Sequence, residues 1–371
     1  MRRPHARRRA VESVLAIGSF LAVGLLLATG LGAPPARAQA TCAVARDYWP
    51  TDGWRAATPA SQKVDSAMID SALVHFEREY PALWSVMVIR HGYVVAERYF
   101  EGHDSTETYD LRSATKSITS ILVGLAIAEK GLRGLDQTVG DLFPEYFAGD
   151  DADSRKRAIT VRNLLTMTSG LDWNEMVAQS YFAGKRDWVR AVLDRPMASA
   201  PGQRFIYNTG NAYLLSVAIS RRMHETPLEL ANAKLFGPLG FKVFVPDWAT
   251  DGSGVNAGGG GLRLTTRQMA KIGWLYLNHG CWDGKQVVPA DWVAASTKKW
   301  SDPGPTVRGY GFLWWLSAAI PNAFSAIGYG GQYIIVMPDQ DAVIAMTADP
   351  YDQGNSRHFE VAPKYLVPAM H

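Results

Sequence analysis

Two different periods of apolar residues in the first third of this chain predict a helix followed by a β-hairpin. Residues 66–79 place apolar side chains three and four positions apart, as on one face of an α-helix. The runs 84–90 and 93–100 are rich in β-branched and aromatic residues, which are typical of strands. His91-Gly92 lies between these runs and predicts a tight turn that pairs the two strands.

Strand-like patterns return near the end of the chain, whereas its middle is mostly helical. Strands at both ends around a helical middle are typical of an α+β fold. We predict one lobe from about 45–134 and 250–371, with a mostly helical lobe over about 135–249 inserted into it. Further strands are predicted at 310–316, 332–337 and 342–347, and further helices at 160–168, 187–193, 211–223, 228–235, 266–278 and 357–366.

A hydroxyl and an amine are spaced to meet at the start of a buried helix. Residues 118–128 are apolar almost all round, which is typical of a helix inside a protein. Ser113 and Lys116 precede this run three positions apart, so one helical face would carry both side chains. Burial favours the neutral form of an amine, which can then accept a proton from a hydroxyl. We therefore predict that Ser113 is a nucleophile and Lys116 its proton partner.

Chance is the alternative explanation of this spacing. A Ser-x-x-Lys sequence is expected roughly once in a chain of this length at ordinary composition. A second one, Ser296 to Lys299, follows a helix start predicted at 289–291 and ends in a charged segment. We expect this second pair on the surface.

Residues 1–40 have the pattern of an export signal. Six Arg and a single acidic residue accompany an uncharged apolar run over 13–33, and Ala38-Gln39-Ala40 suits a cleavage site. The mature protein would then be periplasmic or secreted. The run is also long enough to span a bilayer, so an uncleaved inner-membrane anchor is the alternative. Membrane contact is expected through this segment alone.

The charge balance excludes nucleic acid as a partner. The chain has 38 basic and 35 acidic residues, a formal net charge of +3. Outside residues 1–40 acidic residues slightly outnumber basic ones, and Lys and Arg form no cluster with interleaved aromatic residues. The eight His are scattered without the spacing of metal ligands, so we predict neither a metal nor a cofactor.

The two cysteines, Cys42 and Cys281, both follow the predicted signal. In an oxidising compartment they would form a disulfide that ties the N-terminal segment of the mature chain to its body. Two free thiols are the alternative, and the sequence does not distinguish between the two states.

Three short motifs occur in the order and rough spacing of a known superfamily. They are Ser113-x-x-Lys116, Tyr207-Asn208-Thr209 and Tyr329-Gly330-Gly331. Over nearly all of residues 48–366 the chain resembles the serine β-lactamase-like superfamily, and most of all its class C-related branch. That branch includes family VIII-type carboxylesterases, 6-aminohexanoate-dimer hydrolases and D-aminopeptidase-like enzymes. The resemblance implies an antiparallel sheet flanked by helices.

The resemblance also implies a role for each residue of the first two motifs. Ser113 would be the nucleophile, and Lys116 and Tyr207 would exchange its proton as a coupled pair in which neither is singled out as the base. A core aromatic is the alternative role for Tyr207. Asn208 and Thr209 would lie near the substrate carbonyl, although the family usually has an amide where this chain has Thr209.

The third motif implies the oxyanion site. Gly330 and Gly331 permit close approach of the backbone to a substrate, and the Gln332 amide would pair with the Ser113 amide as oxyanion donors. Tyr329 stands where β-lactamases and cell-wall peptidases carry Lys. The cation that would hold a substrate carboxylate is therefore missing, which favours an esterase or amidase.

These patterns together predict an exported serine hydrolase that cleaves a small-molecule ester or amide through an acyl-enzyme on Ser113. Trp173, Trp314 and Trp315 would wall an acyl pocket or pack in the core. The alternative function is a penicillin-binding, cell-wall-sensing or D,D-peptidase-like protein that is acylated with little turnover. The sequence indicates neither the substrate nor the oligomeric state.

Overall fold

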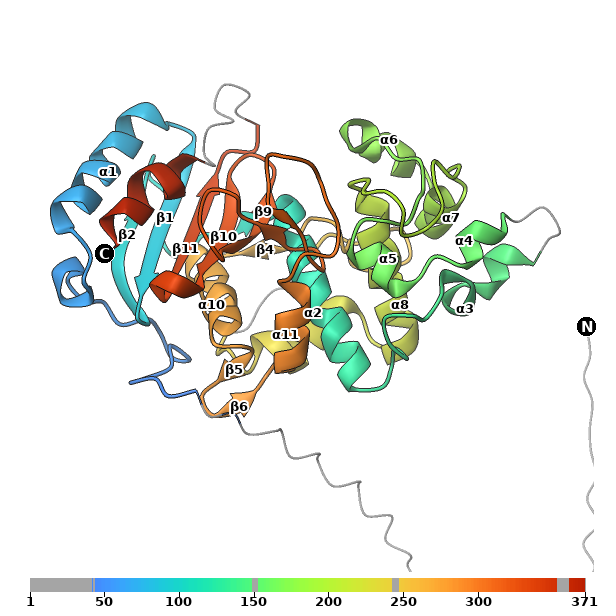
Figure 1. Cartoon of the computed structure of the whole chain (residues 1–371), viewed down its shortest axis with the longest axis horizontal. Coiled ribbons are helices and arrows are strands. Elements are labelled where there is room, and N and C mark those ends of the chain that lie inside the picture. The colour runs from blue at the N-terminus through green and yellow to red at the C-terminus, as the bar shows by residue number, and fades with distance from the viewer. Residues whose placement is uncertain (1–41, 43, 149–152, 242–246, 352–359, 371) are drawn as a thin grey trace, which may run out of the picture. The chain divides into compact units, whose positions relative to one another are not determined.

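Seven antiparallel strands form the central sheet of the computed structural model, in the order β2-β1-β11-β10-β9-β8-β7 (Figure 1). The structure describes residues 42, 44–148, 153–241, 247–351 and 360–370. The sheet strands are β1 (Leu83–Arg90), β2 (Tyr93–Tyr99), β7 (Gly309–Tyr310), β8 (Trp315–Leu316), β9 (Phe324–Gly328), β10 (Gln332–Met337) and β11 (Ala342–Ala348). Two short ribbons pair β3 (Tyr109–Asp110) with β4 (Arg263–Leu264) and β5 (Cys281–Trp282) with β6 (Lys285–Gln286).

Short helices make up most of the remaining described chain. They are α1 (Ser66–Glu79), α2 (Thr115–Ala128), α3 (Val139–Leu142), α4 (Ser154–Arg157), α5 (Val161–Leu165), α6 (Ala178–Phe182), α7 (Trp188–Leu193), α8 (Thr209–Met223), α9 (Pro227–Ala231), α10 (Thr266–Leu277) and α11 (Ala290–Ser296). Several begin at a side-chain cap, as where Asp65 accepts a hydrogen bond from the Met68 amide at 2.9 Å.

The two faces of the sheet build two separate hydrophobic cores, because successive side chains of a strand point to opposite faces. Val86 packs with α1 and with the helical turn Ala362–Leu366, whereas the next residue, Met87, belongs to the core that contains α10. Helix α10 lies close on the sheet, since a Cβ on Gly273 would come within 2.5 Å of Val343. The antiparallel sheet is thus covered by helices on both faces.

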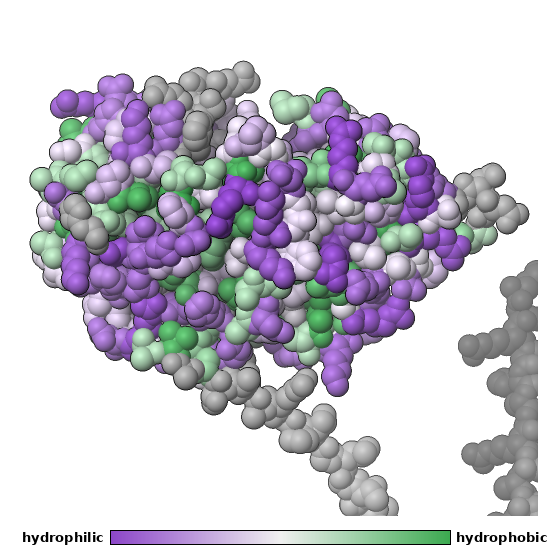
Figure 2. Space-filling view, viewed as in Figure 1, coloured by the Kyte–Doolittle hydropathy of each residue, from purple (hydrophilic) through white to green (hydrophobic). Residues whose placement is uncertain are grey.

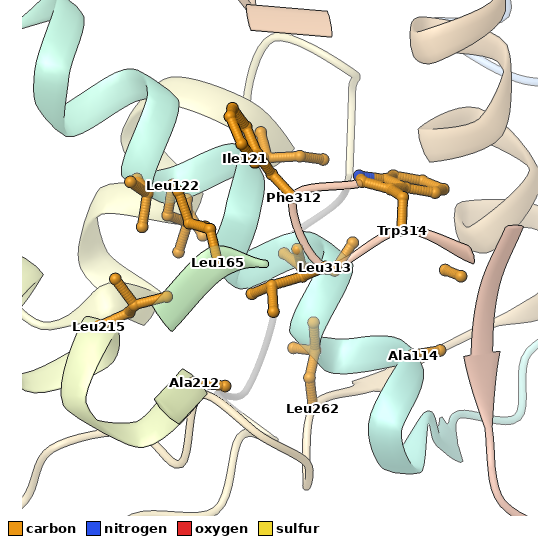
Figure 3. Packing of buried hydrophobic residues seen from close by; sticks show 14 of the residues in the cluster. Ala114, Ile121, Leu122, Leu165, Ala212, Leu215, Leu262, Phe312, Leu313 and Trp314 are labelled. Carbon is orange, nitrogen blue, oxygen red and sulfur yellow. The ribbon is translucent and has the colours of Figure 1, made fainter. Parts of the chain in front are cut away.

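Helix α2 is buried along most of its length. Every residue from 115 to 126 is buried, including the polar ones. Ile121 and Leu122 of α2 pack in one cluster with Leu165 of α5 and Leu215 of α8 (Figure 3). The prediction that residues 118–128 form a helix inside the protein agrees with this packing.

The distribution of elements confirms the predicted fold class. Between residues 139 and 236 the described elements are all helical, and α3 to α8 gather on the side away from α1 (Figure 1). Every strand of the sheet comes from 83–99 or 309–348. The fold is therefore α+β, an antiparallel sheet flanked by helices. The exact lobe boundaries stay a prediction.

Some predicted elements differ from those observed. The run 310–316 is divided into β7 and β8, because the chain turns between them and Leu313 has a φ of +59°. Strand β9 was not predicted. Of the helix predicted at 357–366, the described part contains one helical turn, Ala362–Leu366, and 357–359 lie outside the described residues.

Residues 1–40, which carry the predicted signal or anchor, lie outside the described residues. In the part of the chain that the structure describes, no helix combines the length and apolar character needed to cross a membrane. Polar residues cover much of the face shown in Figure 2, with apolar residues scattered between them.

A disulfide joins Cys42 to Cys281, with the two Cα atoms 5.8 Å apart. The Cys42 amide also donates to the carbonyl of Gly284 at 3.2 Å. Cys42 is thereby attached to the ribbon of β5 and β6. Of the two states left open by the sequence, the structure has the bonded one.

Candidate active site

Ser113 and Lys116 lie side by side where α2 begins. Ser113 belongs to a 3₁₀ turn, Arg112–Ala114, which continues directly into the helix. Nζ of Lys116 donates to Oγ of Ser113 at 2.8 Å and to the carbonyl of Gly259 at 2.9 Å. Only 1% of the Lys116 side chain is exposed. The amine is therefore held inside the protein with its hydrogen-bonding end on the hydroxyl.

The turn that presents Ser113 is held by neighbouring backbone and side-chain groups. Arg112 has a φ of +48°, a region that residues with a Cβ rarely adopt. Oδ1 of Asp110 accepts from the Arg112 amide at 2.8 Å, and the Leu111 amide donates to the carbonyl of Leu262 at 2.8 Å. Such backbone strain persists only where the surroundings enforce it, so these contacts set the direction of Ser113.

The end of strand β9 packs against the same turn. A Cβ on Gly328 would lie 2.1 Å from the carbonyl oxygen of Leu111, so glycine alone fits without movement of the turn. Gly328 pairs in register with Gln332, the first residue of β10. The Gln332 side chain is buried, and its Nε2 donates to the carbonyl of Ala348 at 2.5 Å. The pairing brings the Gln332 backbone close to the turn that carries Ser113.

The residues between β9 and β10 form a tight, uncharged turn. Gly330 and Gly331 have φ values of +80° and +102°, which glycine adopts without strain. Tyr329, for which the motif resemblance implies the position of a Lys in β-lactamases, is 69% exposed. The residue expected at that position is thus an exposed phenol.

Tyr207 reaches the same cluster from the helical part of the chain. Nζ of Lys116 lies 4.9 Å from the centroid of the Tyr207 ring. The ring stacks on Trp315, with 5.5 Å between centroids. The amide of Ile206 donates to the carbonyl of Met167 at 2.8 Å, which holds the segment in front of α8. The structure therefore brings Ser113, Lys116 and Tyr207 together.

A second phenol, Tyr310, packs edge-on against Tyr207 with 6.4 Å between ring centroids. Burial raises the pKa of Tyr310 well above its usual 10, and the charges of Tyr207 and Glu175 raise it further. Tyr310 is therefore a protonated phenol at neutral pH that packs against the ring of Tyr207.

Asn208 and Thr209, which the second motif implies near the substrate carbonyl, both make contacts within the protein. Asn208 is fully buried, and its side-chain oxygen accepts from the Asn211 amide at 3.2 Å, which caps α8. The structure therefore gives Asn208 a capping role, because an Asn side chain readily satisfies the free amides of a helix start, and its contact with a substrate stays a prediction. Thr209 directs its hydroxyl to the carboxylate of Glu175.

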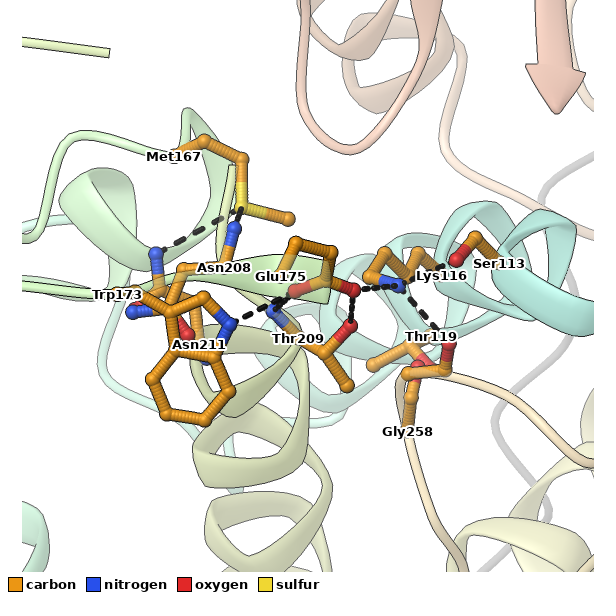
Figure 4. Close-up of polar contacts among 11 residues, drawn as sticks. Ser113, Lys116, Thr119, Met167, Trp173, Glu175, Asn208, Thr209, Asn211 and Gly258 are labelled. Atoms are coloured by element: carbon orange, nitrogen blue, oxygen red, sulfur yellow. Dashed lines mark hydrogen bonds and ion pairs between the residues drawn. The ribbon is translucent and has the colours of Figure 1, made fainter. Parts of the chain in front are cut away.

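Glu175 is a site residue that the sequence patterns did not single out. Its Oε2 accepts from the Trp173 indole at 2.7 Å and from the Thr209 amide at 3.0 Å, and its Oε1 lies 4.0 Å from Nζ of Lys116 (Figure 4). The carboxylate comes from the short turn Glu175–Val177, far in sequence from both Lys116 and Thr209. The one feature of the sequence near Glu175 that relates to its contacts is Trp173, two residues before it. A Trp two residues before a Glu does not by itself predict a site residue.

The tryptophans divide between packing and the site. Trp173 is buried, lies 4.8 Å from the Tyr181 ring and donates to Glu175, so it supports that carboxylate. Trp314 is fully buried against Tyr276 at 4.5 Å between centroids. Trp315, the first residue of β8, stacks on Tyr207 instead, with 5.5 Å between ring centroids.

In the second Ser-x-x-Lys sequence, which was expected on the surface, the serine is buried and the lysine is exposed. Ser296 is fully buried at the end of α11, where its hydroxyl donates to the carbonyl of Val293 at 3.1 Å. The prediction of a surface position is therefore wrong for Ser296, because α11 packs its last turn inward. Lys299 is half exposed and pairs with Asp302 at 3.1 Å. The helix ends between them, so the two side chains do not share a helical face.

Large apolar side chains are exposed around the candidate site. Met176, next to Glu175, is 88% exposed, and Tyr351 is 76% exposed. The guanidinium carbon of Arg112 lies over the Tyr351 ring, 4.9 Å from the centroid of that ring. Met176 thus exposes apolar surface one residue from Glu175, and Tyr351 exposes an aromatic ring against Arg112, which precedes Ser113.

Two surface cavities lie beside the ribbon of β3 and β4, and Asp110 and Arg263 line both. Arg112 lines the smaller one, of about 250 Å³. Of the described residues, Ser113, Lys116 and Tyr207 line neither cavity. Within that same part of the chain, no group of three or more His, Cys, Asp or Glu side chains is placed to hold a metal ion.

Comparison with known proteins agrees with this fold. The beta-lactamase family model matches residues 78–358. The 6-aminohexanoate-dimer hydrolase of Paenarthrobacter ureafaciens is 26% identical over 332 residues, which cover 82% of each chain. Two solved structures, each 16% identical, share the fold. One is EstCE1, a hydrolase with promiscuous acyltransferase activity, with a TM-score of 0.67 over 84% of this chain and 100% of that one. The other is a family VIII carboxylesterase, with a TM-score of 0.64 over 85% of this chain and 98% of that one.

The matched region covers most of the chain, from helix α1 to a point beyond β11, and contains all three motifs. The resemblance inferred from those motifs is thereby confirmed. The chain belongs to the beta-lactamase family of serine hydrolases.

Proposed function

We propose that this protein hydrolyses uncharged carboxylic esters or amides through an acyl-enzyme on Ser113. The observation that carries the proposal is the 2.8 Å hydrogen bond between Nζ of Lys116 and Oγ of Ser113, formed by an amine that is 1% exposed. A serine hydroxyl is a weak nucleophile unless a neighbouring group removes its proton during attack. In the proposal, Lys116 and Tyr207 supply such a group: Nζ of Lys116 contacts the hydroxyl, and the Tyr207 ring lies 4.9 Å from that nitrogen.

In the proposed reaction, Oγ of Ser113 bonds to the substrate carbonyl carbon while its proton passes to the pair of Lys116 and Tyr207. The main-chain amides of Ser113 and Gln332 donate to the oxyanion that forms. The bond to the alcohol or amine then breaks, and that leaving group takes the proton from the pair. Water next adds to the acyl carbon and gives one proton to the pair, which returns it to Ser113 as the carboxylic acid leaves.

The residue types near the site support esters and amides without a carboxylate. By the resemblance of the third motif, Tyr329 would stand in place of the Lys that holds the carboxylate of a β-lactam or cell-wall peptide. Met176, next to Glu175, and Tyr351, against Arg112, expose apolar and aromatic surface. Among the similar proteins, one is a 6-aminohexanoate-dimer hydrolase and another a carboxylesterase, so both amide and ester cleavage occur on this fold.

We also propose that the protein works in an oxidising compartment, periplasmic or extracellular, after export directed by residues 1–40. The bond between Cys42 and Cys281 supports this proposal, because disulfides persist mainly outside the reducing cytosol. Retention through an uncleaved N-terminal anchor is the alternative, and N-terminal sequencing of the protein from the membrane and soluble fractions of its host distinguishes the two.

The experiment that tests the activity compares the wild type with Ser113→Ala on a nitrophenyl ester, by stopped flow and at steady state. We expect a burst of one nitrophenol per chain followed by continued turnover, with both lost in Ser113→Ala. Activity that persists in the variant would overturn the assignment. A burst without turnover would instead indicate the alternative, a penicillin-binding or cell-wall-sensing protein that is acylated and stays so.

A further inference from the structure

Glu175 forms the most extensive polar network of the candidate site. Its two carboxylate oxygens accept from the Trp173 indole at 2.7 Å, from the Thr209 amide at 3.0 Å and from the Thr209 hydroxyl. Oε1 also faces Nζ of Lys116 at 4.0 Å. Donors from two separate segments thus hold the carboxylate against the amine (Figure 4).

Three acceptors surround the amine of Lys116. Nζ faces Oγ of Ser113 at 2.8 Å, the carbonyl of Gly259 at 2.9 Å and Oε1 of Glu175 at 4.0 Å. Lys116 and Glu175 therefore lie at the distance of an ion pair, in which opposite charges offset each other.

This pairing decides which charge a substrate meets. Arg112 is the neighbouring cation, and its guanidinium lies 3.5 Å from Asp110 and over the Tyr351 ring. The side chain of Glu175 is 31% exposed, whereas that of Lys116 is 1% exposed. An incoming molecule consequently meets the carboxylate more directly than the amine.

We propose that Glu175 is a positioning residue that neutralises Lys116 and thereby makes the site select against substrates that carry a carboxylate near the reacting carbonyl. The inference rests on the proposed function, since it assumes that Ser113 is the nucleophile. It adds that uncharged and cationic acyl groups are the preferred class.

The test uses two fluorophosphonate probes of equal length, one with an alkyl chain that ends in a methyl group and one that ends in a carboxylate. These probes label an active serine without any turnover. The rate constant of labelling is measured for the wild type and for Glu175→Gln, which keeps the shape of the side chain and removes its charge. We expect the wild type to prefer the methyl probe, and we expect the preference to fall by about threefold to tenfold in Glu175→Gln at low salt.

Two further variants separate charge from structure. Thr209→Val removes one hydrogen bond to Glu175 but keeps the carboxylate, so labelling slows while the preference between the probes stays unchanged. Glu129→Gln removes an exposed carboxylate that pairs with Lys234 at 3.2 Å, beyond the other end of α2, and leaves both rates unchanged.

The outcomes are distinct. Equal slowing of both probes in Glu175→Gln, with the preference unchanged, would overturn the role in selectivity and leave Glu175 as a structural residue. A wild type that prefers the carboxylate probe would overturn it as well. Failure of both probes to label Ser113 in the wild type would instead overturn the proposed function, and this inference with it.

Discussion

Nζ of Lys116 donates a 2.8 Å hydrogen bond to Oγ of Ser113 although almost none of the lysine side chain reaches solvent. A buried amine is stable only where acceptors replace its lost water. Here the acceptors are the serine hydroxyl, the carbonyl of Gly259 and, at 4.0 Å, the carboxylate of Glu175. The contacts that stabilise Lys116 in the fold are therefore the same ones that direct its amine at the Ser113 hydroxyl.

Replacement of this amine tests its part in the reaction. In Lys116→Met the side chain keeps its length and apolar stem, so we expect the fold to persist while kcat/KM for a nitrophenyl ester falls by about 10²–10⁴-fold, as for the loss of a general acid or base. Lys299→Met is the matched control from the second Ser-x-x-Lys sequence. Since Lys299 pairs with Asp302 at the surface, its replacement should leave kcat/KM unchanged.

Tyr207→Phe removes the phenolic hydroxyl and retains the ring that stacks on Trp315. We expect the melting temperature to stay close to that of the wild type and kcat/KM to fall by about 10²–10⁴-fold. Steady-state kinetics and a thermal melt on the same preparation check both parts. A variant with full activity would show that Tyr207 is a packing residue.

Gly328→Ala places a methyl group where the carbonyl of Leu111 lies, because the new Cβ would be 2.1 Å from that oxygen. The turn that carries Ser113 must then move, so we expect a loss of about 1–3 kcal/mol in the free energy of unfolding and a larger loss of activity. Urea denaturation and ester turnover measure the two effects. Gly252→Ala serves as control, since nothing lies within 4 Å of a Cβ there, and it should change neither.

Removal of the disulfide tests the attachment of the N-terminal segment. The bond joins residues 239 positions apart, and a cross-link of this kind stabilises a protein by restricting the unfolded chain. Cys42→Ser should lower the free energy of unfolding by about 2–4 kcal/mol while kcat at 25 °C is retained. Equal stability of the reduced and oxidised wild type in denaturant would contradict this expectation.

The acid stability of the protein should depend on Asp251. Burial raises the pKa of this carboxyl, but hydrogen bonds from Tyr213, Ser253 and Val255 outweigh burial and leave the pKa below its usual 3.8. A carboxyl with a lowered pKa in the folded state takes up its proton more readily when unfolded. Its contribution to stability is thus complete above about pH 4–5 and is lost as the pH falls through the lowered value.

Asp251→Asn removes this contribution. We expect it to lower the free energy of unfolding by about 1–3 kcal/mol at pH 7, and by less at pH 3. Urea titrations at several pH values check the prediction. Asp136→Asn, at a side chain that is 84% exposed and pairs with Arg162, is the control. Parallel stability profiles for Asp251→Asn and the wild type would contradict the argument.

Strongly periodic segments could be predicted from the sequence. The helix expected over 66–79 coincides with α1, because α1 buries one regular face. The strand expected over 332–337 coincides with β10, which lies between β9 and β11 inside the sheet and is almost wholly buried. Strand β9 was missed because Phe324–Gly328 is short, contains Ser, Ala and Gly, and gains its strand conformation by pairing with β10.

Only the site residues that belong to a sequence motif could be predicted. Ser113 and Lys116 follow from local helix geometry, and Tyr207 entered only by resemblance. Glu175 could not be found, because its place beside Lys116 depends on how the turn Glu175–Val177 packs against α8 and α2. Asn208 illustrates the converse: it belongs to a recognised motif, yet the fold uses its side chain to cap a helix.

The most direct test of the central claim is the mass of the covalent adduct that a fluorophosphonate forms with the intact protein, followed by peptide mapping. We predict one adduct per chain, located on the peptide that contains Ser113, and none on Ser113→Ala. An adduct on any other residue, or one that persists in Ser113→Ala, would contradict the account.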